Sequence, residues 1–209
     1  VLSVITLLGG VLMSAAFVRL AVPARLSDRT SPGGLSLDDS AYLDGDLTLT
    51  LGDPPITFRP GDDRPVIDWL RHNVHGIVTV AEAPGQGYSW AGRIAVHTGL
   101  QSVIGWPYHQ SQQRRAYGNE VAEREADMQS FFSSADRSVM VSVLQRHRIA
   151  YVVFGTLESV LAGDSGRDAL LGLPCLDEVF HDGAHFVSEV DQRCLADQPG
   201  ALPYSPLPR

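Results

Sequence analysis

The highest concentration of chemically versatile side chains lies in residues 105–115, with the sequence GWPYHQSQQRR. Trp106, Tyr108 and His109 are amphipathic aromatic residues, and Arg114-Arg115 is the only adjacent arginine pair in the chain. Aromatic rings stack on sugar rings, and guanidinium groups bind phosphate or carboxylate through paired hydrogen bonds. The segment therefore indicates a site for a sugar that carries an anionic group. The alternative is a surface loop packed on the domain or at a membrane interface, where Trp and Tyr are enriched.

Three residues upstream of this segment are predicted to lie beside it. The segments 77–83 and 102–105 are short apolar runs that read as buried strands. If the two strands are parallel, their carboxyl ends share one edge, and open α/β sheets bind ligands at that edge. The predicted substrate-binding residues are Glu82, Tyr88, Arg93, Trp106, His109, Arg114 and Arg115.

The charged members of this group allow two outcomes. They bind a polar ligand, or they satisfy one another in a network in which Glu82 hydrogen-bonds Arg93 directly. The sequence contains no Ser-His-Asp order, no paired catalytic carboxylates and no P-loop. We therefore predict no catalytic residue in this chain and no cofactor.

The segment Gly85-Gln86-Gly87 invites comparison with a dinucleotide-binding motif. The third glycine, Gly92, comes two positions too late, and no acidic residue ends the next strand to bind a ribose. A tight turn is the favoured interpretation, because glycine adopts positive φ without strain. Such a turn could still present backbone N–H groups to a phosphate.

Asp182-Gly183 is the strongest hairpin signal, between predicted strands 176–181 and 185–190. With this pair as the turn, His181 pairs with Ala184 and His185 pairs with Phe180. The two imidazoles then point to opposite faces, and no metal site is expected.

The same register places Cys175 opposite Val190. A disulfide between Cys175 and Cys194 therefore requires both strands to end before the cysteines, since the two Cα atoms must approach within about 7 Å. The sequence leaves the redox state of this pair open.

Composition excludes several classes of protein. The 209 residues include 16 Lys and Arg against 24 Asp and Glu, a net charge of −8, which argues against nucleic-acid binding. The 44% of hydrophobic residues excludes a wholly disordered chain. Helices are expected over 65–74, 89–97, 120–132 and 136–146, with shorter pieces at 157–161 and 168–171, and a further strand over 149–154. Alternating strands and helices predict a small three-layer α/β domain with a short, mainly parallel sheet and a C-terminal β-hairpin.

The N-terminus differs from the rest of the chain. Residues 1–18 carry no charge, and a helix of this length spans about 27 Å, close to the thickness of a bilayer core. A signal peptide and a buried core helix are the alternatives to a transmembrane anchor, and charge alone leaves its orientation open. The predicted organisation is a transmembrane helix over 1–22, a linker with a short strand over 23–64, an extracytoplasmic α/β domain over 65–195 and a disordered tail over 196–209.

Residues 35–160 resemble the C-terminal part of the Chlor_Arch_YYY family, which consists of polytopic membrane proteins. The residues that carry the resemblance are Leu37, Asp38, Ala41–Leu43, Ile67–Leu70, Asn73, Val74, Glu82, Ala83, Tyr88, Ser89, Arg93, Thr98–Leu100, Gly105–Pro107, His109, Arg114, Glu120, Val121, Arg124, Ala126, Asp127, Tyr151–Val153, Gly155, Leu157 and Glu158. That family in turn looks like the GT-C type of membrane glycosyltransferases, in which a many-helix membrane part precedes an extracytoplasmic domain.

The resemblance implies that the apolar helix is the last span of a longer parent chain whose catalytic acids lie in its membrane part. The expected partners are membrane lipid, a lipid-linked sugar or glycan, and the rest of the parent, at the cell membrane. The first hypothesis is thus an accessory or acceptor-binding domain of a glycosyltransferase-like protein, inactive alone. The second is a membrane-anchored structural or interaction module without enzymatic activity. A third is a secreted nucleotide-binding protein that exposes the 85–87 turn.

Overall fold

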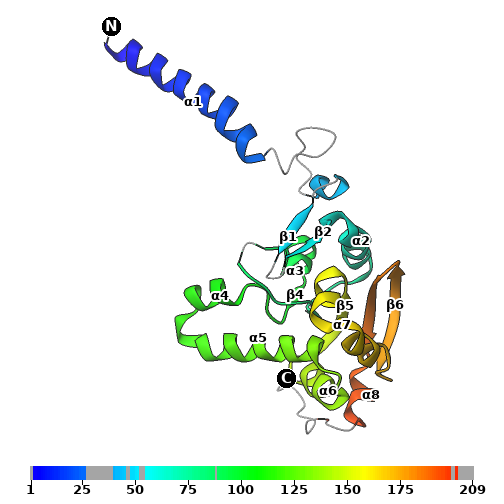
Figure 1. Ribbon diagram of the computed structural model, residues 1–209. Coiled ribbons are helices and arrows are strands. Elements are labelled where there is room, and N and C mark those ends of the chain that lie inside the picture. Colours follow the sequence, from blue (N-terminus) through cyan, green and yellow to red (C-terminus); the bar gives the residue numbers. More distant parts are fainter. Residues whose placement is uncertain are drawn as a thin grey trace. The chain divides into compact units, whose positions relative to one another are not determined.

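The computed structural model describes residues 2–26, 40–45, 48–51, 55–87, 89–198 and 201 (Figure 1). The chain forms two compact units, Val1–Asp62 and Asp63–Arg209. Much of the predicted linker 23–64 and most of the predicted tail 196–209 lie outside the described residues.

The first unit begins with helix α1 (Leu2–Leu26). The helix predicted over residues 1–22 is present and continues to Leu26. The large apolar side chains between Leu8 and Leu20 are all more than half exposed. Within the part of the chain that the structure describes, no helix is both long enough and apolar enough to span a membrane. The predicted transmembrane segment is therefore not confirmed.

The rest of the first unit is short. It contains the 3-10 helix η1 (Ala41–Asp44) and two antiparallel strands, β1 (Leu49–Leu51) and β2 (Ile56–Phe58). The strand expected within the linker is β1. A second 3-10 helix, η2 (Pro60–Asp63), leads to the second unit.

The second unit is an α/β domain built on a five-stranded sheet. Its strands are β3 (Thr79–Ala81), β4 (Gln101–Ser102), β5 (Ile149–Phe154), β6 (Leu176–Asp182) and β7 (His185–Val190), in the order β4-β3-β5-β7-β6. β3 pairs in parallel with both β4 and β5, whereas β7 pairs antiparallel with both β5 and β6. The sheet is thus mixed rather than mainly parallel. The reason is that a tight hairpin forces its two strands to be antiparallel, and β7 also pairs with β5.

The helices are α2 (Arg64–Asn73), α3 (Arg93–Thr98), α4 (Pro107–Gln113), α5 (Gly118–Ser133), α6 (Arg137–Arg146), α7 (Thr156–Leu171) and α8 (Gln192–Ala196), with the 3-10 turn η3 (Arg115–Tyr117) before α5. The Asp136 carboxylate caps α6 as expected, accepting a hydrogen bond from the Ser138 N–H. Helix α3 begins later than predicted because Gly92, with φ of 78°, directly precedes it. The two helical pieces predicted within 157–171 form one element, α7, with Gly163 at φ 59° between them.

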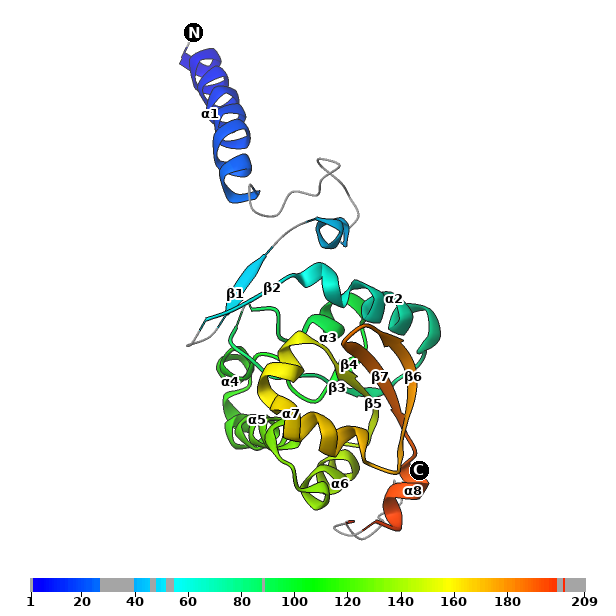
Figure 2. The same ribbon diagram turned by 45° about the vertical axis from the view of Figure 1, so that its right-hand side comes forward.

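Helices cover both faces of the sheet (Figure 2). On one face, the Trp69 ring of α2 lies 6.5 Å from the Tyr151 ring of β5 and 5.7 Å from the Phe180 ring of β6. On the other face, Phe154 and its strand partner Phe186 stack at 4.8 Å. They belong to the main apolar core, together with Met128, Phe131, Met140 and Leu144 of α5 and α6. The alternation of side chains along β5 therefore separates a small α2 layer from a larger α5–α7 layer.

The hairpin has a different register from the predicted one. Asp182 pairs with His185 and His181 pairs with Phe186, so the turn residues are Gly183 and Ala184. Gly183 has φ of 62° at the first turn position, where a type II′ turn places glycine. The prediction placed glycine second, as in a type I′ turn. The turn is therefore displaced by one residue, and His181 pairs two residues further along β7 than predicted, with Phe186 instead of Ala184.

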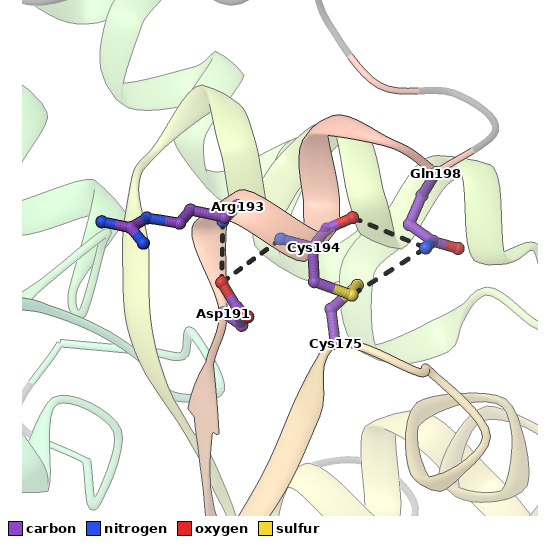
Figure 3. Close-up of a disulfide and its surroundings, with 5 residues drawn as sticks. All are labelled: Cys175, Asp191, Arg193, Cys194 and Gln198. Atoms are coloured by element: carbon purple, nitrogen blue, oxygen red, sulfur yellow. Dashed lines mark hydrogen bonds between the residues drawn. A yellow bond between two sulfur atoms is a disulfide. The ribbon is translucent and has the colours of Figure 1, made fainter.

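Cys175 and Cys194 form a disulfide with a Cα–Cα distance of 5.4 Å (Figure 3). The geometric condition for it is met, because β6 begins at Leu176 and β7 ends at Val190. Asp191 then starts α8 by accepting hydrogen bonds from the Arg193 and Cys194 N–H groups. This turn brings Cys194 back to Cys175.

Removing the disulfide should destabilise the domain without changing its fold. In the chain-entropy account, a loop of 19 residues contributes about 3 kcal/mol to the free energy of unfolding. We expect the Cys175→Ser/Cys194→Ser double variant of the full chain to lose about this amount in urea titrations followed by tryptophan fluorescence. Reductant should lower the stability of the unmodified chain equally and leave the double variant unchanged; an equal effect on both would contradict the prediction.

Candidate functional site

A single buried guanidinium lies at the carboxyl ends of β3 and β5. The Arg93 side chain is fully buried, and its Nη1 and Nη2 donate hydrogen bonds to Glu158 Oε1 (3.1 Å) and Oε2 (2.7 Å). Its Nε lies 2.6 Å from Asp63 Oδ2, and Nη1 lies 3.7 Å from Glu82 Oε2. We call these four residues the Arg93 cluster. It contains one positive group and three acidic ones.

Two of the three carboxyl groups of the Arg93 cluster, those of Glu158 and Glu82, also tie backbone segments together. Glu158, in the first turn of α7, accepts hydrogen bonds from the N–H groups of Gly155 (2.9 Å) and Ala83 (2.7 Å). These two residues follow β5 and β3, so one side chain links the ends of both strands. The capping position that Glu158 occupies, three residues after Gly155, is a pattern visible in the sequence.

Glu82 connects β3 to α3 and β4. Its carboxyl oxygens accept hydrogen bonds from the N–H groups of Ile94 (3.0 Å) and Ala95 (3.3 Å) and from the Ser102 hydroxyl. The hydrogen bond expected between Glu82 and Arg93 is replaced by a longer ion pair. The reason is that the guanidinium faces Glu158 and Asp63 instead.

Asp63 completes the cluster from the start of α2. Its Oδ2 accepts a hydrogen bond from Trp90 Nε1 at 2.7 Å, while Oδ1 has no hydrogen-bond partner within the described residues and lies 3.5 Å from His185 Nε2. A Cβ at Gly155 would lie 2.5 Å from the same Oδ1. Only glycine therefore fits at the end of β5.

Burial has opposite consequences for the two kinds of charge. Burial raises the pKa of Glu82 above its ordinary value, against the lowering effects of Arg93, the Ser102 hydroxyl and the Ile94 N–H. Burial alone would lower the pKa of Arg93, but Asp63 and Glu158 raise it above its ordinary value. Arg93 thus stays charged, and burial favours the protonated form of Glu82.

The cluster occupies the place where open α/β sheets bind ligands. The helix after β3 packs with α2, whereas the helix after β5 packs with α5, so the two connections run to opposite faces. The crevice at such a reversal is the usual ligand site. Here the Arg93 side chain and its carboxylates fill it. Of the two outcomes predicted for Glu82 and Arg93, the structure therefore shows the one in which buried charged side chains pair with one another.

Two adjoining pockets lie beside the cluster, around α4 and the start of α5. The first, the Trp106 pocket, has a volume of about 520 Å³ and is lined by residues that include Ser102, Trp106, His109, Gln110, Arg114 and Arg124. The second, the Tyr117 pocket, has a volume of about 500 Å³, and its lining includes Gln110, Arg114, Arg115, Tyr117, Glu120 and Arg124. Three lining residues are common to both, so the pockets are neighbouring parts of one surface.

The aromatic wall of the Trp106 pocket is held by hydrogen bonds. Trp106 Nε1 donates to the Ala91 carbonyl (2.5 Å), and the His109 ring packs edge-on against the indole at 6.2 Å. His109 Nε2 in turn lies 2.9 Å from Gln113 Nε2. The loop that carries Trp106 also approaches Gly92 closely, since a Cβ at Gly105 would lie 3.2 Å from the Gly92 Cα.

Three arginines supply the charge of the pockets. Arg114, Arg115 and Arg124 are exposed, and no carboxylate among the described residues forms an ion pair with them. Glu120 is the one acidic residue that lines either pocket in the described part of the chain. Positive charge therefore gathers here in a chain whose net charge is −8.

The structure separates the predicted site residues into two groups. Glu82 and Arg93 lie in the buried cluster, whereas Trp106, His109, Arg114 and Arg115 line the pockets; Tyr88 lies outside the described residues. Sequence reasoning did not assign Asp63, Glu158 or Arg124 to the site. Within the described residues, no group of three or more His, Cys, Asp or Glu side chains is arranged to bind a metal ion.

Comparisons with known proteins add little. No protein-family model matches the chain, and no curated protein matches it significantly. Membership of the Chlor_Arch_YYY family therefore stays a prediction. Among solved structures, the chain is similar to the C-terminal globular domain of an oligosaccharyltransferase from Archaeoglobus fulgidus, with 12% identity and a TM-score of 0.40 over 62% of this chain and 97% of that domain. At this score the similarity carries no functional conclusion.

Loss of the buried guanidinium should be strongly destabilising. Arg93→Met leaves three acidic groups buried without a counter-charge, which costs about 3–5 kcal/mol of unfolding free energy. Arg146→Met is the matched control, because the Arg146 side chain is half exposed and its partner Asp127 keeps a second contact with His147, so the expected loss is under about 1 kcal/mol. Urea titration of both variants measures the difference, and equal losses would refute the assigned role of Arg93.

Proposed function

We propose that the domain is a binding module whose two adjoining pockets take up a carbohydrate that carries an anionic group. The observation that carries this proposal is the set of three arginines around the shared lining of the pockets, without carboxylate partners among the described residues. An exposed arginine is ordinarily available for paired hydrogen bonds to phosphate or carboxylate, and its planar donors match both groups.

The remaining lining suits a sugar ring. Trp106 and His109 line the Trp106 pocket with aromatic rings, and Gln110 offers both a donor and an acceptor for sugar hydroxyls. The hydrogen bond to Ala91 fixes the indole before any ligand arrives, which lowers the entropic cost of binding. Arg114 and Arg124 line the same pocket and could bind an anion attached to a ring that stacks on Trp106.

We infer that the role is accessory rather than catalytic. The three acidic residues of the Arg93 cluster, Glu82, Asp63 and Glu158, are buried and line neither pocket. The resemblance of residues 35–160 to the Chlor_Arch_YYY family supports an acceptor-binding or accessory domain of a GT-C-like glycosyltransferase. Its sugar-transfer chemistry would then belong to a membrane part of the parent chain.

Calorimetric titration of the full chain with glucose 1-phosphate, glucose and inorganic phosphate tests the binding proposal. We expect the sugar phosphate to bind more tightly than either fragment. Arg114→Ala should weaken sugar-phosphate binding by roughly 10- to 100-fold, because one charge-assisted interaction is worth about 1.5–3 kcal/mol. Trp106→Ala should weaken sugar-phosphate binding while leaving phosphate binding nearly unchanged.

Arg146→Ala is the control for a general loss of positive charge, since Arg146 lies in α6 and lines neither pocket. It should bind all three compounds as the unmodified chain does. Absence of binding by the unmodified chain, or equal losses in Arg114→Ala and Arg146→Ala, would favour the structural or interaction module instead.

We further propose that α1 attaches the domain to the extracytoplasmic face of a membrane. The uncharged run 1–18 and the exposed apolar side chains between Leu8 and Leu20 support membrane attachment. The Cys175–Cys194 disulfide supports an oxidising compartment, because disulfides persist there and are rare in the cytosol.

Flotation with phospholipid vesicles tests this attachment. The full chain should float with the vesicles, and a chain that lacks residues 1–22 should stay in the aqueous fraction. Leu12→Arg/Phe17→Arg should release the full-length chain as well, since each charge costs about 2.5–3.5 kcal/mol at the centre of a bilayer. A full chain that is monomeric in buffer without detergent and does not float would refute the attachment.

A further inference from the structure

The Arg93 cluster and the Trp106 pocket share one side chain. Ser102, in β4, lines the pocket and donates its hydroxyl hydrogen to Glu82 Oε1. Glu82 is fully buried behind it and receives two further hydrogen bonds from the N–H groups of Ile94 and Ala95. Ser102 is therefore the contact between a buried titratable group and the proposed ligand pocket.

A serine hydroxyl has one hydrogen and two acceptor lone pairs. While Glu82 is ionised, the single hydrogen of Ser102 is committed to the carboxylate, and only lone pairs of the hydroxyl can face the pocket. When Glu82 is protonated, its own O–H can donate to Ser102 Oγ. The hydrogen of Ser102 is then available to an acceptor in the pocket.

We propose that anion binding in the Trp106 pocket is coupled to the uptake of one proton by Glu82, with the Ser102 hydroxyl as the donor that this proton releases. The inference rests on the proposed function, because it concerns the same pocket. The proton comes from solvent and binds the Glu82 carboxylate, and no covalent bond between heavy atoms changes. Protonation also removes a buried negative charge beside the anion, so both effects favour the same state.

The surroundings of Glu82 make it the cluster member suited to this role. Arg93 lies 3.7 Å away, Glu158 acts on it as a like charge, and Asp63 stands on the far side of the guanidinium. Burial is the largest influence on the pKa of Glu82 and raises it. When Glu82 is protonated, Arg93 still pairs with the carboxylates of Asp63 and Glu158. Glu82 can therefore take up one proton without leaving the guanidinium unpaired.

Two histidines also stand near this network. His185 faces Asp63 from β7 at 3.5 Å, and His97 of α3 packs on Trp90, the donor to Asp63. His185 reaches the cluster through Asp63. His109 lines the pocket itself, and its own protonation would also favour an anion. The experiment must therefore separate His109 from Glu82.

The direction of the effect follows from linkage. A bound anion raises the affinity of Glu82 for a proton, and protonated Glu82 raises the affinity of the pocket for the anion by the same factor. Anion affinity should therefore rise as pH falls through the pKa of Glu82, with up to a tenfold increase per pH unit over that interval, and level off below it.

The test uses the full chain carrying His109→Gln and sulfate as the probe, because sulfate keeps its charge between about pH 4.5 and pH 8 while phosphate does not. Calorimetric titrations across this range should show tighter sulfate binding at lower pH. In the His109→Gln/Glu82→Gln chain the affinity should not vary with pH, since Gln carries no titrating proton. His109→Gln/Ser102→Ala should bind more weakly at low pH, with a smaller increase.

A second measurement avoids any change in the buried cluster. Sulfate is titrated into the His109→Gln chain in two buffers that differ in ionisation enthalpy, and the difference in heat counts the protons taken up. Uptake approaching one proton near the midpoint of the pH dependence supports the coupling. Sulfate binding without proton uptake, or an unchanged pH dependence in the Glu82→Gln chain, overturns it. Absence of sulfate binding at every pH overturns the proposed function as well.

Discussion

One buried guanidinium is the interaction on which the second unit depends. Arg93 is surrounded by Asp63, Glu82 and Glu158, which come from the start of α2, the end of β3 and the first turn of α7. Removing three carboxyl groups from water is expensive unless a positive charge and directed hydrogen bonds compensate for it. Because each carboxyl group also binds backbone N–H groups or the Trp90 indole, the position of this one charge determines how the strand ends and helix starts meet.

The same interaction determines where a ligand can bind. The crevice at the carboxyl ends of β3 and β5 would ordinarily receive a ligand, but Arg93 and its partners fill it. The accessible concave surface lies further along the chain, between α3, α4 and α5, where Arg114 and Arg124 line both pockets. Arg93 thus stabilises the fold, whereas Arg114 and Arg124 are available to bind a ligand. Ser102 joins the two regions, since it touches the buried Glu82 and also lines a pocket.

Many elements could be predicted from local patterns, and the exceptions have local causes. The strand 149–154 and the helix after Asp136 follow from a β-branched run and a capping residue. The hairpin was predicted with the wrong register, because Gly183 serves as the first rather than the second turn residue. Next to the turn the two registers differ by two residues, which keeps each side chain on the same face of the sheet, so the pattern of apolar residues could not distinguish them.

The sequence by itself determined most of the longer helices and strands, the acidic character of the chain and the uncharged N-terminal run, because these depend on residue type and on neighbours along the chain. It also indicated that Trp106, His109 and Arg114 belong to one segment. It did not predict β2, α4 or α8, which are short elements. Only the tertiary structure decided that Arg93 pairs with Glu158 and Asp63 rather than binding a ligand, and that Arg124 joins the pocket. Residues 93 and 158 lie 65 positions apart, and a charge buried by folding takes the partners that the packed strands and helices bring to it.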